Sequence, residues 1–98
     1  MRIVWSKKAT YTFYNIKNYL EQYWTLLISK KFIKDVLHII VLLEKNPQLG
    51  KYNIELSCRE IVISKQVKLY YEIKETDLIL IAFSNSRQKP ISFIDLQS

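Results

Sequence analysis

Glycine, proline and cysteine are all scarce in this chain of 98 residues, and each shortage excludes a class of structure. The sequence contains one glycine, two prolines and one cysteine. With so few turn-forming residues, long irregular loops are not expected, and the connections should be short or built from Asn, Ser and Lys. The single cysteine, Cys58, excludes an internal disulfide and fits a reducing compartment.

Long apolar runs and targeting signals are also lacking. The apolar runs at residues 39–43 and 78–83 are far too short to span a bilayer. The N-terminus, MRIVWSKK, meets charge at once and lacks the apolar region of a signal peptide. We therefore expect a cytoplasmic protein with no membrane partner. A hydrophobic fraction of 49% predicts a globular fold, and the length predicts one domain over residues 1–98.

The charge is strongly positive but unevenly placed. A net charge of +6 suggests nucleic acid or an acidic protein as a partner. Residues 1–50 hold eight basic and three acidic side chains, whereas residues 51–98 hold seven and six. The excess therefore lies in the N-terminal half, and a helical surface kept soluble by lysines explains it equally well.

Apolar spacing predicts a short strand followed by two helices. Residues 3–5 are β-branched or aromatic, and Ser6 suits the N-cap of a helix over residues 7–23. A second helix is expected over residues 27–45. Apolar side chains at three- and four-residue steps should form the buried faces: Ala9, Phe13, Ile16, Leu20 and Tyr23 in the first helix, and Phe32, Ile33, Val36, Leu37, Ile40 and Leu43 in the second.

The second half of the chain predicts a small antiparallel sheet. Pro47 and Gly50 should end the second helix in a turn, with Gly50 at a positive φ. Runs over residues 59–64, 67–74 and 78–84 then predict three strands, the last of them central and covered on both faces. The resulting fold class is α+β, with a short N-terminal strand and a two-helix hairpin packed on the sheet in the order β-α-α-β-β-β.

The second helix carries more apolar side chains than one face can bury. Ile39, Val41 and Leu42 lie outside its predicted stripe. They either remain exposed for a partner or are covered by helices and sheet that pack more tightly than expected.

Metal and cysteine chemistry have little support. His38 is the only histidine, and Cys58 has no nearby Cys or His to complete a site. We expect no metal and no cofactor, and we interpret His38 as a core or interface residue. A nucleophilic Cys58–His38 pair would require the two side chains to meet in space.

Basic and aromatic side chains in the C-terminal half are the remaining candidates. Such residues can hold phosphates, stabilise charge in a phosphoryl transition state, or stack on bases. The set comprises Arg59, Lys65, Lys68, Tyr70, Tyr71, Arg87 and Lys89. Lys68 and Tyr70 should share one face of a strand, with Tyr71 on the other. The alternative is that these side chains have no functional role and only reflect the alternation of polar and apolar residues in a half-exposed strand.

Four segments together resemble the RelE/ParE superfamily of bacterial type II toxins. They are IVWSKKA, LLEKNPQLGK, REIVISKQVKLYYEI and LILIAFSNSRQKP, and the match runs from residue 2 to about residue 90. The resemblance implies a small toxin held in a hetero-oligomeric complex by a cognate acidic antitoxin. A partly helical antitoxin segment would then fold over Ile39, Val41 and Leu42.

One branch of this superfamily, the RelE-like branch, cuts messenger RNA on the ribosome. For that branch the resemblance implies catalytic roles for Lys68 and Arg87, which stand where it carries arginines. Glu60 and Val62 replace lysines, and Phe93 replaces a tyrosine. Glutamate and valine cannot supply positive charge, and phenylalanine has no proton to donate.

The other branch, the ParE-like branch, inhibits DNA gyrase without that catalytic set, and the helical half is more similar to it. Arg59, Lys65, Tyr70 and Lys89 are then candidates for contacts with the target or with nucleic acid. We favour this function over the ribosome-dependent nuclease. A degenerate toxin that only binds its antitoxin is the third possibility.

Overall fold

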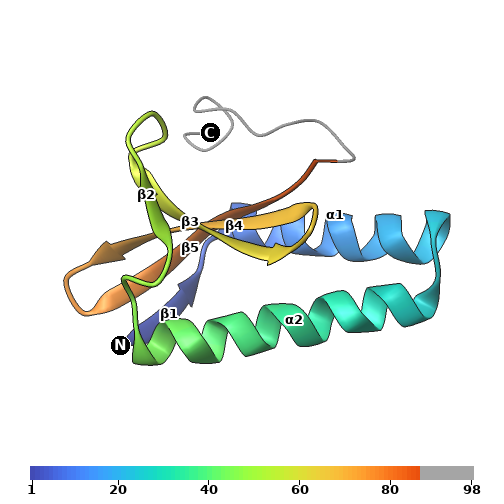
Figure 1. The fold of residues 1–98 in the computed structure, drawn as a ribbon, viewed down its shortest axis with the longest axis horizontal. Helices are drawn as coiled ribbons and strands as arrows, with labels where there is room; N and C mark the ends of the chain where they lie inside the picture. Colours follow the sequence, from blue (N-terminus) through green and yellow to red (C-terminus); the bar gives the residue numbers. More distant parts are fainter. Residues whose placement is uncertain (87–98) are drawn as a thin grey trace.

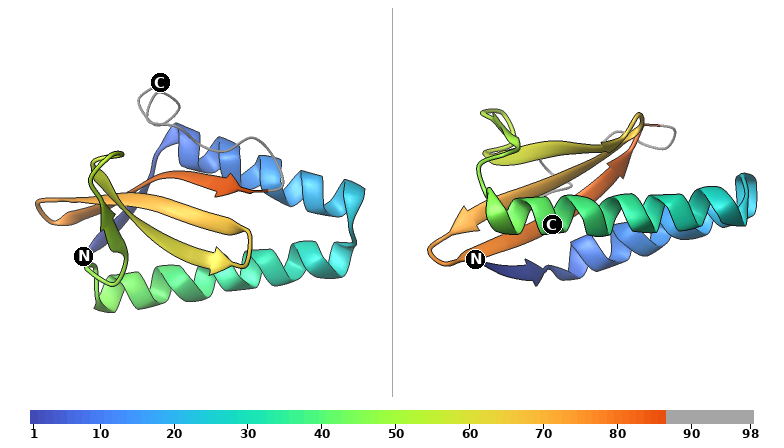
Figure 2. Two further views of the ribbon diagram at one scale, coloured as in Figure 1. Left: turned by 45° about the horizontal axis from the view of Figure 1, so that its top comes forward. Right: turned by 60° about the horizontal axis from the view of Figure 1, so that its bottom comes forward.

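Two helices pack against one face of a five-stranded sheet (Figures 1 and 2). This computed structural model describes residues 1–86 of the chain. The elements are β1 (Arg2–Trp5), α1 (Lys7–Tyr23), α2 (Leu26–Lys45), β2 (Lys51–Asn53), β3 (Cys58–Ser64), β4 (Val67–Lys74) and β5 (Asp77–Asn85). The predicted α+β class and the helical hairpin are confirmed.

The sheet is mixed rather than wholly antiparallel, with the strand order β1-β5-β4-β3-β2. β1 pairs in parallel with β5, with Arg2 opposite Asp77 and Trp5 opposite Leu80. The crossover between these parallel strands contains the helical hairpin and the other three strands, so local alternation could not reveal the pairing. The short strand β2 occupies a segment expected to be loop, and β5 lies inside the sheet as predicted.

Ser6 sets the start of α1 and ties it to the sheet. Its Oγ accepts a hydrogen bond from the Ala9 amide at 2.9 Å, as predicted for an N-cap, and donates to the Ile81 carbonyl at 2.9 Å. One turn further on, Thr12 Oγ1 accepts from the Phe83 amide at 2.9 Å. Phe83 lies beyond the part of β5 that pairs with β1, so at this point the edge of β5 is hydrogen-bonded to a side chain of α1 instead of to a strand.

The buried face of α2 is narrower than predicted. Its buried residues are Ser29, Phe32, Val36, Ile40 and Leu43. Leu37 is 56% exposed, because it lies one residue outside this stripe on the outer side of the helix. Tyr23, expected on the buried face of α1, is 66% exposed, since the helical hairpin continues past the sheet and nothing lies beneath its last turn (Figure 1).

The core lies between the helices and the sheet and is rich in aromatic rings. The Phe13 ring stacks on Phe32, with centroids 5.3 Å apart, and contacts Trp5 edge-on at 5.5 Å. Phe83 of β5 packs on the same group. Tyr70 and Tyr71 are adjacent on β4 and buried on its opposite faces, and the register shift between them leaves Ile81 of β5 as an extra residue between their partners Ala82 and Leu80.

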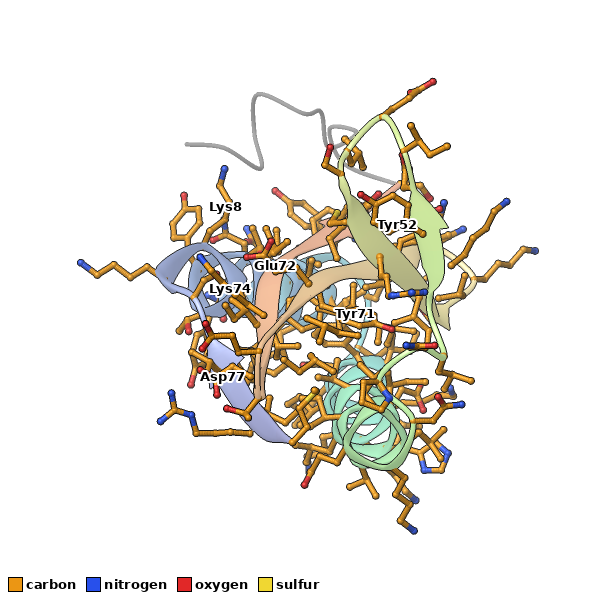
Figure 3. The ribbon with its side chains drawn as sticks, turned by 90° about the vertical axis from the view of Figure 1, so that its left-hand side faces the viewer. Lys8, Tyr52, Tyr71, Glu72, Lys74 and Asp77 are labelled. Atoms are coloured by element: carbon orange, nitrogen blue, oxygen red, sulfur yellow. The ribbon has the colours of Figure 1, made fainter. Side chains whose placement is uncertain are left out.

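Gly50 is required for a reason other than the one predicted. It does not take a positive φ; the positive φ values among residues 1–86 belong to Ser57 and Glu75. Instead, a Cβ on Gly50 would lie 2.6 Å from the Tyr71 hydroxyl oxygen. That hydroxyl accepts from the Gly50 amide and donates to the Pro47 carbonyl, both at 2.8 Å. Figure 3 shows Tyr71 between the sheet and α2, and burial raises the pKa of its phenol.

Candidate functional site

The face of the sheet that points away from the helices carries Lys68 and Tyr70 of the predicted site. On β3 this face presents Cys58, Glu60 and Val62, and on β4 it presents Lys68 and Tyr70. Ile61, Leu69 and Tyr71 point the other way, into the core. The predicted division of Lys68 and Tyr70 from Tyr71 is therefore confirmed.

A shallow pocket of about 200 Å³ lies at the end of the β3–β4 hairpin on this face. Three candidate residues, Lys65, Lys68 and Tyr70, line it together. Its full lining is Val62, Ser64, Lys65, Gln66, Lys68, Tyr70, Ser84, Asn85 and Ser86. Two ammonium groups beside hydroxyl and amide groups can hold a phosphate-sized anion.

The charge of Lys68 is already engaged. Its Nζ lies 3.6 Å from Glu60 Oε1, and Asn53 Nδ2 donates to Glu60 Oε2 at 3.2 Å. Lys68 stands opposite Val62 in the register, which places Glu60 diagonally across the strand pair. The sequence indicated only that Glu60 replaces a lysine. Its pairing with Lys68 could be inferred only once the register was known.

Arg59 does not join this pocket. It points to the helical side of the sheet, where its Nη1 donates to the Gly50 carbonyl at 2.9 Å. Its guanidinium carbon lies 6.0 Å from the centroid of the Tyr52 ring, on the neighbouring strand. Arg59 therefore holds the segment between α2 and β3. Arg87, Lys89 and Phe93 lie outside the described residues.

Cys58 and His38 cannot form a nucleophilic pair. Cys58 is buried on the face of the sheet opposite the helices, whereas His38 is exposed on α2. A core position for His38 was therefore a wrong expectation. Burial, followed by the nearby carboxylates of Glu60 and Glu72, raises the pKa of the Cys58 thiol to about 11. Such a thiol is protonated at neutral pH and unsuited to nucleophilic attack.

Metal-ligating residues do not gather in the described part of the chain. Within residues 1–86, no three His, Cys, Asp or Glu side chains form a cluster that could hold a metal ion. The same residues contain no helix that is long and apolar enough to cross a membrane.

The three apolar residues assigned to antitoxin binding differ in exposure. Val41 is exposed, Leu42 is half-buried, and Ile39 packs partly against the core. Leu37, one helical turn before Val41, is exposed on the same outer side of α2. The outer side of α2 therefore presents Leu37 and Val41 together.

A second exposed apolar surface lies at the tip of the helical hairpin and was missed in the sequence. We define the hairpin tip as the exposed residues Tyr23, Trp24, Leu26, Leu27 and Ile28. Periodicity placed Tyr23 in the core and assigned no role to the others. The signal that was available is five bulky apolar side chains within six residues at a turn between helices.

The arrangement of a helical hairpin on one face of this mixed sheet places the molecule in a class with bacterial toxins of known structure. It matches the chromosomal ParDE toxin–antitoxin system from P. aeruginosa with a TM-score of 0.74 and 12% identity, over 87% of this chain and 95% of that one. It matches a YoeB/ParE toxin from Agrobacterium tumefaciens with a TM-score of 0.59 and 10% identity, over 87% and 98%. At these identities the likeness establishes the fold.

The sequence identifies the family within that class. Residues 3–90 match the family described as the ParE toxin of the type II toxin–antitoxin system, parDE. No curated protein sequence matches the chain. The chain belongs to the ParE toxin family, so the resemblance to RelE/ParE toxins is confirmed.

Proposed function

We propose that this protein inhibits bacterial growth by binding DNA gyrase and that a cognate acidic antitoxin neutralises it. Membership of the ParE family supports the toxin function. The observation that separates gyrase binding from RNA cleavage is the Glu60–Lys68 ion pair, at 3.6 Å. It engages Lys68, one of the two lysines of the pocket on the open face, whereas a nuclease needs positive charge there that is free to stabilise the transition state. The protein would act in the cytoplasm, where gyrase works.

The outer side of α2 suits the antitoxin. Leu37 and Val41 are exposed there, and Lys30 and Lys34 precede them at the spacing of one helical turn. An amphipathic antitoxin helix with acidic residues would bury the apolar pair and meet the lysines. The half-buried Ile39 and Leu42 would contribute only at the edge of this contact. A hetero-oligomeric toxin–antitoxin complex follows from the proposal.

A ribosome-dependent nuclease is the second candidate, and the pocket on the open face is the observation that favours it. The pocket brings Lys65, Lys68 and Tyr70 within reach of one ligand. In this function Lys68 would stabilise the transition state, and Arg87 would assist it. The close carboxylate of Glu60 opposes that role, because it would repel the phosphate.

Induced expression in bacteria, followed by purification, tests the proposal. We expect growth arrest, broken chromosomal DNA and inhibition of supercoiling by purified gyrase, all reversed by the antitoxin. A Lys68→Ala variant should inhibit gyrase as well as the parent chain, because Lys68 has no part in this function. Cleaved transcripts on ribosomes with normal supercoiling would instead support the nuclease. Normal growth under full expression would indicate a degenerate toxin.

A further inference from the structure

The hairpin tip is the most prominent exposed apolar surface among the described residues. Its most exposed side chain, Leu27, is 77% exposed, and Trp24 is 48% exposed. The tip lies at one end of the molecule's long axis, beyond the sheet (Figure 1). The core therefore gains little from these residues, and a structural role does not explain their apolar character.

The tip is positively charged as well as apolar. Residues 22–34 contain three lysines and no acidic residue, but Lys31 Nζ lies 2.8 Å from Asp35 Oδ2, so Lys30 and Lys34 supply the net positive charge of the tip. Lys30, Lys31 and Lys34 line a surface hollow together with Leu27 and Ile28. The first turn of α2 also contains no acidic residue, so the partial positive charge of its N-terminus adds to that of the lysines. The surface fits an apolar site with an acidic rim.

The shape of the tip distinguishes between possible partners. Leu26, Leu27 and Ile28 follow one another at about 100° around the first turn of α2, so they point in diverging directions. A peptide lying along a helix can cover a stripe, but it cannot enclose such a convex end. A cavity on a larger protein can enclose it, with Trp24 and Leu27 as anchors. A second copy is disfavoured, because two tips would bring their lysines together.

We propose that the hairpin tip is the surface by which this toxin inserts into an apolar, acid-rimmed cavity of its target. This inference rests on the proposed function, which identifies the target as gyrase. The apolar side chains of the tip are separate from those of the antitoxin surface, since Leu27 and Leu37 are 10 residues apart along α2, about 15 Å at the rise of an α-helix, and only Lys30 and Lys34 adjoin both. Target binding and antitoxin binding should therefore be separable by mutation.

Three single variants test this separation. Leu27→Asp replaces the anchor by a charge that an acidic rim repels, whereas Leu37→Asp makes the same change on the same helix at the proposed antitoxin surface. Ile54→Asp, in the turn between β2 and β3, is the control for surface charge. All three side chains are exposed, so the variants should fold, and circular dichroism checks this. Trp24→Ala provides a second test of the tip without added charge.

We expect Leu27→Asp to raise the toxin concentration for half-inhibition of supercoiling roughly tenfold or more, with antitoxin affinity changed less than about threefold. Leu37→Asp should show the reverse, and Ile54→Asp should leave both unchanged. Inhibition by Leu27→Asp and Trp24→Ala at the parent concentration would overturn the inference while the proposed function stands. Loss of antitoxin binding by Leu27→Asp alone would assign the tip to the antitoxin and overturn it as well.

Two further outcomes are distinguishable. If the parent toxin does not inhibit gyrase, the proposed function fails before the variants are compared, and the inference fails with it. Vesicles of phosphatidylglycerol and phosphatidylcholine test a lipid partner. The parent toxin could sediment with the anionic vesicles while the Leu27→Asp variant does not, although that variant still inhibits gyrase. This result would assign the tip to a membrane surface and overturn the inference.

Discussion

Replacing Gly50 by alanine should destabilise the protein, because the added methyl group would enter a buried and closely packed site. The new Cβ would lie 2.6 Å from the Tyr71 hydroxyl oxygen, 2.7 Å from its Cε1 and 2.9 Å from the Glu60 carbonyl oxygen. Tyr71 has no exposed surface, and its hydroxyl bonds both Gly50 and Pro47. The ring can move away only by breaking those bonds.

The magnitude follows from these contacts. Forcing an extra carbon into a packed site costs about 1–3 kcal/mol. Loss of a hydrogen bond by a buried group costs about 1–3 kcal/mol more. We expect Gly50→Ala to lower the free energy of unfolding by about 2–5 kcal/mol. For a chain of this size that corresponds to a fall in Tm of roughly 10 °C or more.

Thermal and urea unfolding followed by circular dichroism measure this change. Leu49→Ala is the matched control, because Leu49 is an exposed neighbour in the same turn and its loss should change stability by less than about 1 kcal/mol. In a Tyr71→Leu background the cost of Gly50→Ala should shrink, since only the contact with the Glu60 carbonyl remains. A Gly50→Ala protein within about 0.5 kcal/mol of the parent would refute the reasoning, because it would mean that the segment relaxes freely.

Two further predictions concern Ser6 and Cys58. Ser6→Ala removes both the hydrogen bond that caps the Ala9 amide and the hydrogen bond to the Ile81 carbonyl. It should lower the free energy of unfolding, measured by urea titration, by about 1–2 kcal/mol. An unchanged urea midpoint would show that neither hydrogen bond contributes to stability. Because the pKa of Cys58 is raised from its usual value of 9.0 to about 11, its thiol ionises first in the unfolded chain, so stability should fall as the pH rises from about 9 to about 11. Folded protein should accordingly resist iodoacetamide at pH 8, and rapid labelling would contradict the burial.

Local signals were sufficient for the helices and most of the sheet. Ser6 and Pro47 mark helix boundaries through interactions that span a few residues, so each end could be recognised from the sequence. The alternation over residues 59–64 likewise predicted β3 to within one residue of its observed start. The parallel pairing of β1 with β5 joins residues 75 positions apart, and no local pattern encodes it.

The missed features are those that depend on what lies across the core. Gly50 looked like a turn glycine, but the close approach of Tyr71, 21 residues away, requires it. Leu37 and Tyr23 fit the helical period, yet Leu37 lies on the outer side of α2, and the sheet does not reach the last turn of α1 (Figure 1). The same limit explains why no role was assigned to the exposed side chains of the hairpin tip. Periodicity locates a face, whereas burial depends on the size of the neighbouring layer.

Glu60 contributes both to the stability of the sheet and to the charge of its open face. Its carboxylate accepts from Asn53 on the edge strand β2 and pairs with Lys68 on β4, so one side chain connects three neighbouring strands. A lysine at this position, as in the RelE-like branch, would place two ammonium groups at the diagonal spacing and leave Asn53 without its acceptor. The repulsion alone would cost on the order of 1 kcal/mol in a well-solvated setting. With only three residues in β2, that contact is a large share of what holds the edge. Glu60 therefore helps to hold β2, β3 and β4 together, and it engages the charge of Lys68 in the pocket on the open face.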